Sequence, residues 1–315
     1  MSELERQHAL DRLHIVDTLP ETVYDDLACV AARVCDTPIA LLSLIDRERQ
    51  WFKARVGLGD HETPRSVAVC EQAIRKPGQL MEVRDLAHDL RFASFPGVAG
   101  ELHARFYAGM PLVTSEGHAV GTLCVVDRQP RTLTHTQRAS LASLARIAMA
   151  LLEGHARRHQ EEVAKALKAN AEAPHARSRT LPALEPEKPK APIYRVVILE
   201  VQRFANAVER MGERTVEKLL QSLDETFDAC LRHELGDRIN RVTSSPEFVA
   251  VVSGDDGEAR VEALRRAAAA ESGRGGLVVL VGSAVATSPE EPMEAVFLRA
   301  DEDLSRQKDL APRSG

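Results

Sequence analysis

A proline-rich segment near the middle of the chain constrains the fold more than any other feature of the sequence. Residues 171–192 carry five prolines and few large apolar side chains. Proline fixes its own φ angle and lacks a backbone N–H donor, so we expect this segment to be extended and semi-stiff rather than helical. It is predicted to be a linker that divides the 315 residues into two halves. Each half is long enough to bury a core of its own.

The charge balance and the apolar pattern exclude several classes of protein. A formal net charge of -6 and a pI near 6.0 argue against a nucleic-acid binder, which usually carries a basic face. No apolar run is long enough for a membrane-spanning helix, and the charged N-terminus lacks the apolar core of a signal peptide. We therefore expect a cytoplasmic protein. Its five cysteines are expected to be reduced, with no dedicated metal site and no cofactor.

The first half alternates helix and strand patterns, which indicates an α/β fold. One helix is predicted over residues 20–35, with four apolar residues on a single stripe. These are Leu27, Val30, Ala31 and Val34. The remaining patterns predict strands over residues 39–45, 50–56, 106–114 and 120–126, and a short helix over residues 67–75.

A long helix is predicted to begin after Thr134 and to keep an apolar stripe as far as Leu152. Beyond Glu153 the sequence is polar on all sides, so we expect this part to project from the domain. The stripe consists of Leu141, Leu144, Ala148, Leu151 and Leu152. The expected organisation is a domain over residues 1–155, a helix extension and linker over 156–192, and a domain over 193–315.

Six short blocks occur in order along the first half. They are IDRERQWFK at residues 45–53, ETPR at 62–65, Cys70, RDLAHDLRF at 84–92, RFYAGMPL at 105–112 and GTLCVVD at 121–127. Their order and spacing resemble the GAF domain family over roughly residues 5–153. GAF domains are small antiparallel α/β sensors, so the resemblance implies a ligand pocket between the sheet and the segments that cover it.

Cys70 and Cys124 are the first candidates for that pocket. In the strand that contains Cys124, alternation puts Val120 and Thr122 on the same face as the cysteine. Cys70 begins or lies within a short helix that would cover this face. One reading is a redox-active or ligand-contacting pair. The other, which we favour, is two buried cysteines that act as small apolar residues.

Arg105 and Tyr107 lie at the start of a predicted strand and are two further pocket candidates. In one reading they form a pocket edge, where Arg105 faces an anion and Tyr107 stacks on a ligand or hydrogen-bonds to it. In the other, Tyr107 packs in a structural corner and Arg105 pairs with Asp85 or Asp89. The sequence leaves both readings open. It carries no haem- or bilin-binding pattern beside these residues.

The second half contains a predicted strand, tight turn and strand over residues 241–252, after an apolar run at residues 196–204. With a late strand over 277–284 and a closing helix over 300–308, these runs resemble the GGDEF domain of diguanylate cyclases. The resemblance implies a nucleotidyl-cyclase-like α/β domain over residues 193–315. Ser244, Ser245, Pro246, Glu247 and Phe248 stand where that family has Gly-Gly-Asp/Glu-Glu-Phe.

The residues at the implied metal and phosphate sites depart from the cyclase pattern. Metal ions on a triphosphate need closely spaced carboxylates. Glu200 stands in place of the family's Asp, Pro246 supplies no carboxylate, and Glu247 alone matches. Phosphate approach needs glycines, whereas Ser244 and Ser245 add side chains there. A degenerate cyclase site is therefore expected.

The implied guanine site is altered as well. The family's Asn and Asp fall on Val208 and Glu217, and Val208 has no group that could hydrogen-bond the base. The family's phosphate-binding lysine near the first strand falls on Ala205. Lys308 of the closing helix matches the family. With these losses, we expect the domain not to catalyse cyclic di-GMP formation.

The leading hypothesis is a non-enzymatic bacterial signalling protein and homodimer. Its GAF half would sense a small molecule or mediate dimerisation, and its degenerate GGDEF half would bind a protein partner or, weakly, a nucleotide. The alternative is a low-activity diguanylate cyclase that makes cyclic di-GMP from GTP. A third reading is a redox enzyme built on the GAF cysteines, as in the free methionine sulfoxide reductases that share this fold.

Overall fold

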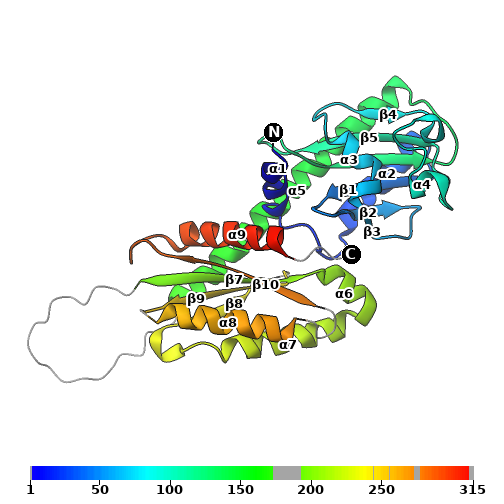
Figure 1. Cartoon of the computed structure of the whole chain (residues 1–315). Coiled ribbons are helices and arrows are strands. Elements are labelled where there is room, and N and C mark those ends of the chain that lie inside the picture. Colours follow the sequence, from blue (N-terminus) through cyan, green and yellow to red (C-terminus); the bar gives the residue numbers. More distant parts are fainter. Residues whose placement is uncertain (1, 173–192, 244, 255, 273–276, 312–315) are drawn as a thin grey trace, which may run out of the picture. The chain divides into compact units, whose positions relative to one another are not determined.

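The computed structural model describes residues 2–172, 193–243, 245–254, 256–272 and 277–311 (Figure 1). The chain forms two compact units, Met1–Arg157 and Arg158–Gly315. The boundary between them falls inside the long helix α5, His135–Glu172. Residues 173–192 of the predicted linker lie outside the described residues.

The first unit is built on a six-stranded sheet of order β3-β2-β1-β6-β5-β4, in which all neighbouring strands are antiparallel. The four long strands agree with the sequence prediction to within one residue at each end. The strands are β1 Ile39–Ile45, β2 Arg49–Val56, β3 Glu62–Pro64, β4 Met81–Val83, β5 Phe106–Val113 and β6 Ala119–Asp127.

Two layers cover this sheet. On one face a core forms beneath α1 (Glu3–Asp11), α2 (Thr22–Cys35) and the first half of α5. The other face is covered by shorter elements, which are η1 Arg65–Val67, α3 Val69–Ala73, η2 Leu86–His88 and α4 Pro96–Ala99. The predicted helix over residues 67–75 is thus shorter than expected.

The buried face of α2 agrees only in part with the predicted stripe. Val30 and Val34 are 43% and 38% exposed, although both were expected to face the core. Leu27 and Ala31 are buried as predicted, and the buried face also includes Tyr24, Ala28 and Cys35. Burial of the large aromatic side chain of Tyr24 contributes much apolar area, which favours an orientation of α2 that buries Tyr24 and leaves Val30 and Val34 exposed.

A β-bulge in β6 changes the predicted face of one residue. Leu112 of β5 pairs with Gly121, but Val113 pairs with Ala119, so Val120 is an extra residue. The bulge shifts the alternation by one position. Val120 therefore packs in the core under α1 and α2, whereas Cys124 faces α3 as expected.

The second unit contains a four-stranded antiparallel sheet of order β10-β7-β9-β8. The predicted strand, turn and strand over residues 241–252 correspond to β8 and β9. A bend at Gly212, with φ +82°, separates α6 from α7. The elements are β7 Tyr194–Gln202, α6 Phe204–Met211, α7 Glu213–Asp228, η3 His233–Leu235, β8 Arg238–Arg241, β9 Glu247–Ser253, α8 Gly257–Glu271, β10 Val278–Val285 and α9 Met293–Leu310.

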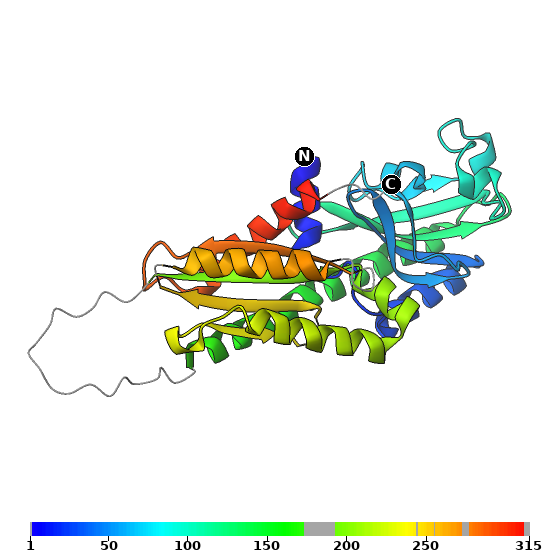
Figure 2. The same ribbon diagram turned by 60° about the horizontal axis from the view of Figure 1, so that its bottom comes forward.

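Each face of this second sheet is covered by helices (Figures 1 and 2). Helices α6, α7 and α8 pack on one face, which carries Leu199 and Phe248. The other face, which carries Ile198, is covered by α9 and by the second half of α5. Residues 158–172 had been expected to project as an extension, but Leu167 is 1% exposed and belongs to this core.

Both units combine helices with antiparallel strands, which confirms the predicted α/β class. None of the helices in the described part of the chain is both long and apolar enough to cross a membrane.

Candidate functional site

Two glutamates lie side by side on adjacent strands of the second sheet. Glu200 of β7 is the register partner of Glu247 of β9. Side chains alternate along a strand, so both glutamates lie on the face that carries Ile198. That face is covered by α5 and α9, and each of these helices contributes one basic side chain to the glutamate pair.

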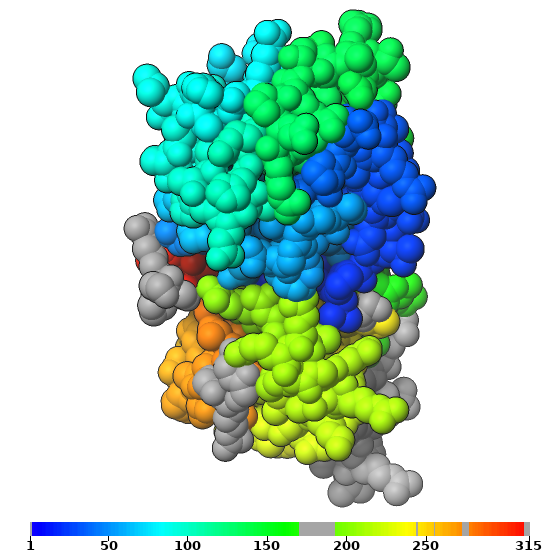
Figure 3. Space-filling model, turned by 90° about the vertical axis from the view of Figure 1, so that its right-hand side faces the viewer, coloured from blue at the N-terminus to red at the C-terminus, as the bar shows by residue number. Residues whose placement is uncertain are grey.

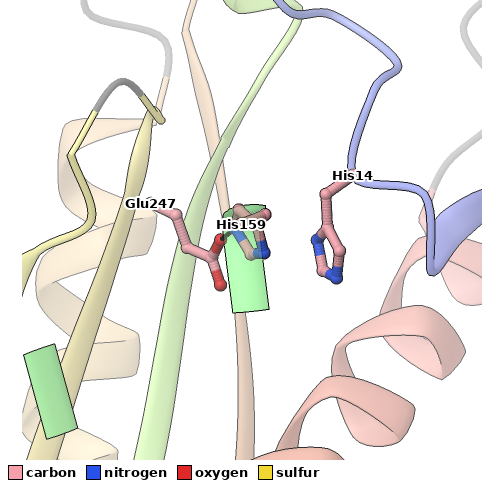
Figure 4. A group of neighbouring side chains, drawn as sticks. All are labelled: His14, His159 and Glu247. Carbon is pink, nitrogen blue, oxygen red and sulfur yellow. Dashed lines mark hydrogen bonds and ion pairs between the residues drawn. The ribbon is translucent and has the colours of Figure 1, made fainter. Parts of the chain in front are cut away.

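Glu247 is paired with His159 of α5. The Nε2 atom of His159 lies 2.6 Å from Oε2 of Glu247, and the two residues are 8% and 1% exposed. Figure 4 shows the pair; His14, also drawn there, belongs to the first unit. Burial lowers the pKa of His159, but the charge and hydrogen bond of Glu247 outweigh it, so the pKa of His159 is raised. The favoured form is an imidazolium held against a carboxylate.

Glu200 is held by two other side chains. Nζ of Lys308 on α9 donates to Oε2 at 2.8 Å, and Nε2 of Gln202 donates to Oε1 at 2.5 Å. Burial raises the pKa of Glu200, Lys308 opposes this rise, and the nearby charge of Glu247 adds to it; the net direction is upward. Both carboxylates therefore have bonds inside the unit. We call Glu200, Glu247, His159 and Lys308 the acid cluster.

The turn before β9 is closed by backbone hydrogen bonds. The amide of Val242 donates to the carbonyl of Glu247 at 2.8 Å, and the amide of Ser245 donates to the carbonyl of Val242 at 3.2 Å. The carbonyl of Pro246 accepts from the amide of Val201 at 3.0 Å, so the turn is tied to β7 as well. Ser244 lies outside the described residues. Pro246 brings no carboxylate to the cluster.

The other expected cyclase positions lie away from the acid cluster. Val208 of α6 and Glu217 of α7 belong to the helices on the opposite face of the sheet, which form the yellow-green surface in Figure 3. Val208 packs against the core beneath it. Oε1 of Glu217 accepts from Arg241 at 2.9 Å. The structure thus brings Glu200, Glu247 and Lys308 together, without Val208 or Glu217.

Three of the four pocket candidates in the first unit meet on the sheet face beneath α3. Sγ of Cys70 lies 3.7 Å from Sγ of Cys124, and the hydroxyl of Tyr107 donates to Cys70 at 3.3 Å. Gln50 donates from Nε2 to Cys70 at 3.1 Å and to Ser43 at 2.8 Å. These polar side chains occupy the space where the resemblance implied a pocket. We call Cys70, Cys124, Tyr107, Thr122, Gln50 and Ser43 the thiol cluster.

The two thiols of this cluster differ in acidity. Burial raises the pKa of Cys70, but its hydrogen-bonding neighbours, first Cys124 and also Tyr107, outweigh burial and lower the pKa to about 6. The pKa of Cys124 is raised well above its usual value, first by its hydrogen bond to Cys70 and then by burial. Burial and the neighbouring thiols also raise the pKa of Tyr107. The donors Tyr107 and Gln50 converge on Cys70, which is the more acidic of the two thiols.

The fourth pocket candidate, Arg105, has a structural role. Its Nη1 donates to the carbonyls of Val98 and Ala104, both at 3.1 Å. The predicted ion-pair partners take other bonds, since Asp85 pairs with His88 and Asp89 with Arg91. Arg105 therefore holds the backbone of the α4 region and does not reach the thiol cluster.

Sequence comparison identifies the first unit. The GAF domain profile matches residues 19–152. This stretch matches the GAF family. The chain is also 42% identical over 149 residues to the cyclic di-GMP phosphodiesterase PA2567 of Pseudomonas aeruginosa, an alignment that covers 47% of this chain and 25% of the relative. The chain thus spans about a quarter of the length of that relative.

Two solved structures illustrate the structural similarity. The GAF domain from the Acinetobacter phosphoenolpyruvate-protein phosphotransferase is 16% identical, with a TM-score of 0.37, over 49% of this chain and 95% of its own. The GGDEF domain of DgcB from Caulobacter crescentus, solved with c-di-GMP, is 17% identical, with a TM-score of 0.34, over 38% of this chain and 74% of its own.

Sequence reasoning missed two members of these sites. His159 was placed in a polar extension, although His159, Val163 and Leu167 recur every fourth residue and mark a buried helix face. Gln50 was assigned only to a strand. Its role depends on the pairing of β2 with β1, which places Gln50 opposite Ile45 and within hydrogen-bonding distance of Ser43, a contact across the sheet that no local pattern reveals.

Proposed function

We propose that this protein is a non-enzymatic bacterial regulator of cyclic di-GMP signalling. In this proposal the GAF domain senses a small molecule or mediates dimerisation. The second unit is a degenerate GGDEF domain that binds a protein partner or, weakly, a nucleotide. The relationship to a cyclic di-GMP phosphodiesterase over the GAF region supports the choice of pathway.

The internal pairing of the two glutamates carries the proposal. A cyclase needs carboxylates that are open to metal ions, because Mg²⁺ prefers oxygen ligands and keeps several waters. Glu247 is 1% exposed and bonded to His159, while Glu200 is bonded to Lys308 and Gln202. A metal would have to displace a protonated base from each carboxylate. Such displacement leaves buried charges that have to find new partners.

A low-activity diguanylate cyclase is the second candidate. The observation in its favour is that Glu200 and Glu247 are direct register partners, since two carboxylates at adjacent strand positions could share a cation. Against it stand Pro246, which adds no third carboxylate, and the bond between Glu217 and Arg241. We therefore rank it below the regulatory role.

A product assay separates the two candidates. The purified full-length protein is incubated with GTP and either Mg²⁺ or Mn²⁺, and cyclic di-GMP is measured by mass spectrometry. We expect no product above that of a Glu247→Ala control. Cyclic di-GMP that forms with the wild type and disappears in the Glu247→Ala variant would support the cyclase and overturn the proposal.

A further inference from the structure

We propose that Cys70 and Cys124 are a peroxide-oxidisable thiol pair whose oxidation closes a disulfide inside the GAF domain. This names hydroperoxides as the class of small molecule that the domain senses, and so it rests on the sensing role proposed above. The inference comes from the placement of two free thiols among polar hydrogen-bond donors in an otherwise apolar core.

The geometry of the pair suits disulfide formation. The sulfur atoms are 3.7 Å apart, and a disulfide requires about 2.05 Å. Cys124 is fixed in the central strand β6, whereas Cys70 is carried by α3, a helix of five residues. A small movement of this short helix would bring the sulfur atoms into bonding distance.

The polar side chains favour Cys70 as the attacking sulfur. Tyr107 and Gln50 both donate hydrogen bonds to its Sγ atom, and donors of this kind stabilise a thiolate. The lowered pKa of Cys70 agrees with this geometry. All six side chains of the thiol cluster are uncharged when protonated, which suits entry of a small neutral oxidant such as hydrogen peroxide. An apolar pair that served only for packing would not need these donors.

The reaction balances with hydrogen peroxide as the oxidant. The Cys70 thiolate attacks one peroxide oxygen, the O–O bond breaks, and the released hydroxide takes up a proton to become water. The sulfenic acid that remains on Cys70 is then attacked by the sulfur of Cys124. The S–O bond breaks, and the second hydroxide leaves as water with the proton that Cys124 gives up. Two thiols are oxidised to one disulfide, and one peroxide is reduced to two waters.

The other cysteines of the chain provide internal controls. Cys35 is also buried, but burial raises its pKa to about 11. Burial likewise raises the pKa of Cys230. Neither has a thiol neighbour like that of Cys70, as far as the bonds of the described residues show. Selective oxidation of the Cys70–Cys124 pair is therefore expected at neutral pH.

The test treats the reduced full-length protein with a few equivalents of hydrogen peroxide, blocks remaining thiols under denaturing conditions, and maps peptides by mass spectrometry without reduction. We expect a Cys70–Cys124 disulfide, and a titratable thiol count that falls from the five of the reduced chain by one pair. A thiol count that stays unchanged, or a disulfide between other cysteines, would overturn the proposal. This readout concerns the thiols alone, so it can fail while the product assay still supports a non-enzymatic second unit.

Three variants assign the roles of the residues. Cys124→Ser should accumulate a sulfenic acid on Cys70 that dimedone traps, and Cys70→Ser should abolish both products. Tyr107→Phe should slow the oxidation about fivefold, because it removes one hydrogen bond to the sulfur. Cys35→Ser, the matched buried control, should leave the rate unchanged. Dimedone adducts on Cys124 instead of Cys70, or equal rates for Tyr107→Phe and wild type, would contradict the assignment.

Discussion

His159 Nε2 and Glu247 Oε2 form a buried bond of 2.6 Å, which joins the helix α5 to the strand that follows the Ser-Ser-Pro turn. The carboxylate at this position is the one that matches the cyclase pattern in the sequence. In the structure its partner is a side chain of the same unit.

Replacing His159 should destabilise the second unit in a pH-dependent way. His159→Ala leaves Glu247 buried without its partner, which costs about 3–5 kcal/mol in the free energy of unfolding. The pKa of His159 is raised in the folded state, so its stabilising effect is complete below the unfolded value of about 6.5 and is lost as the pH rises through the folded value. In calorimetric melting experiments from pH 5.5 to 9, the difference in melting temperature between the wild type and the variant should become smaller as the pH rises.

The control for this series lies on the same helix. His135 is the first residue of α5 and is exposed, so His135→Ala should change the melting temperature little at any pH. A deficit of His159→Ala that stays constant across the pH range would show that the loss is one of packing and not of charge pairing.

Removing Lys308 should make Glu200 harder to ionise. In Lys308→Met the carboxylate keeps its burial and its repulsion from Glu247 but loses the cation that opposes both. A raised folded pKa of an acid costs stability as the pH rises above the unfolded value of about 4.3, so the loss should be larger at pH 8 than at pH 5. Lys165→Met removes an exposed partner of Glu162 and should cost at most about 1 kcal/mol. Equal losses for the two variants at pH 8 would contradict this account.

The second unit should need the end of α5 for its stability. A fragment of residues 158–315 keeps Val163 and Leu167, which are 3% and 1% exposed in its core. A fragment of residues 193–315 exposes the sheet face beneath them and should lose about 1.5–3 kcal/mol for each of these side chains. Urea unfolding followed by circular dichroism compares the two. Equal midpoints would mean that α5 adds nothing to this core.

Gly109 should be intolerant of a side chain. A Cβ atom at this position would lie 2.1 Å from the hydroxyl oxygen of Tyr107, which is 2% exposed. Gly109→Ala must therefore move the tyrosine, at a cost of about 1–3 kcal/mol, and should also slow peroxide oxidation of Cys70. Gly59→Ala is the control, since a Cβ atom there meets nothing within 4 Å. A wild-type melting temperature for Gly109→Ala would contradict the packing described.

The elements that sequence reasoning predicted well are those with a strong local pattern. Alternating or continuous apolar runs gave β1, β2, β5 and β6, and the acidic positions Glu200 and Glu247 followed from the resemblance. The face of Val120 could not be predicted, because the bulge at this residue depends on how β5 pairs with β6. In α2 the burial of Leu27 and Ala31 was predicted correctly, but that of Val30 and Val34 was not, because these two valines are as apolar as the buried residues of the helix.

The role of α5 was missed for a different reason. The segment after Glu153 has many charged residues, and its overall polarity hides the stripe of His159, Val163 and Leu167. From the sequence alone, a histidine in a helix is assigned to the exposed face unless a buried partner for its side chain is known. That partner, Glu247, lies 88 positions further along the chain, beyond the reach of any periodicity argument.

Calorimetric titration of the full-length protein with GTP and Mg²⁺ tests the central claim most directly, namely that each carboxylate of the acid cluster is bonded to a basic side chain of its own unit and that no nucleotide site remains. We predict no binding heat at micromolar concentrations, for the wild type and for Glu200→Ala alike. A micromolar dissociation constant in the wild type that is lost in Glu200→Ala would show that a nucleotide site survives around Glu200, and would contradict the account.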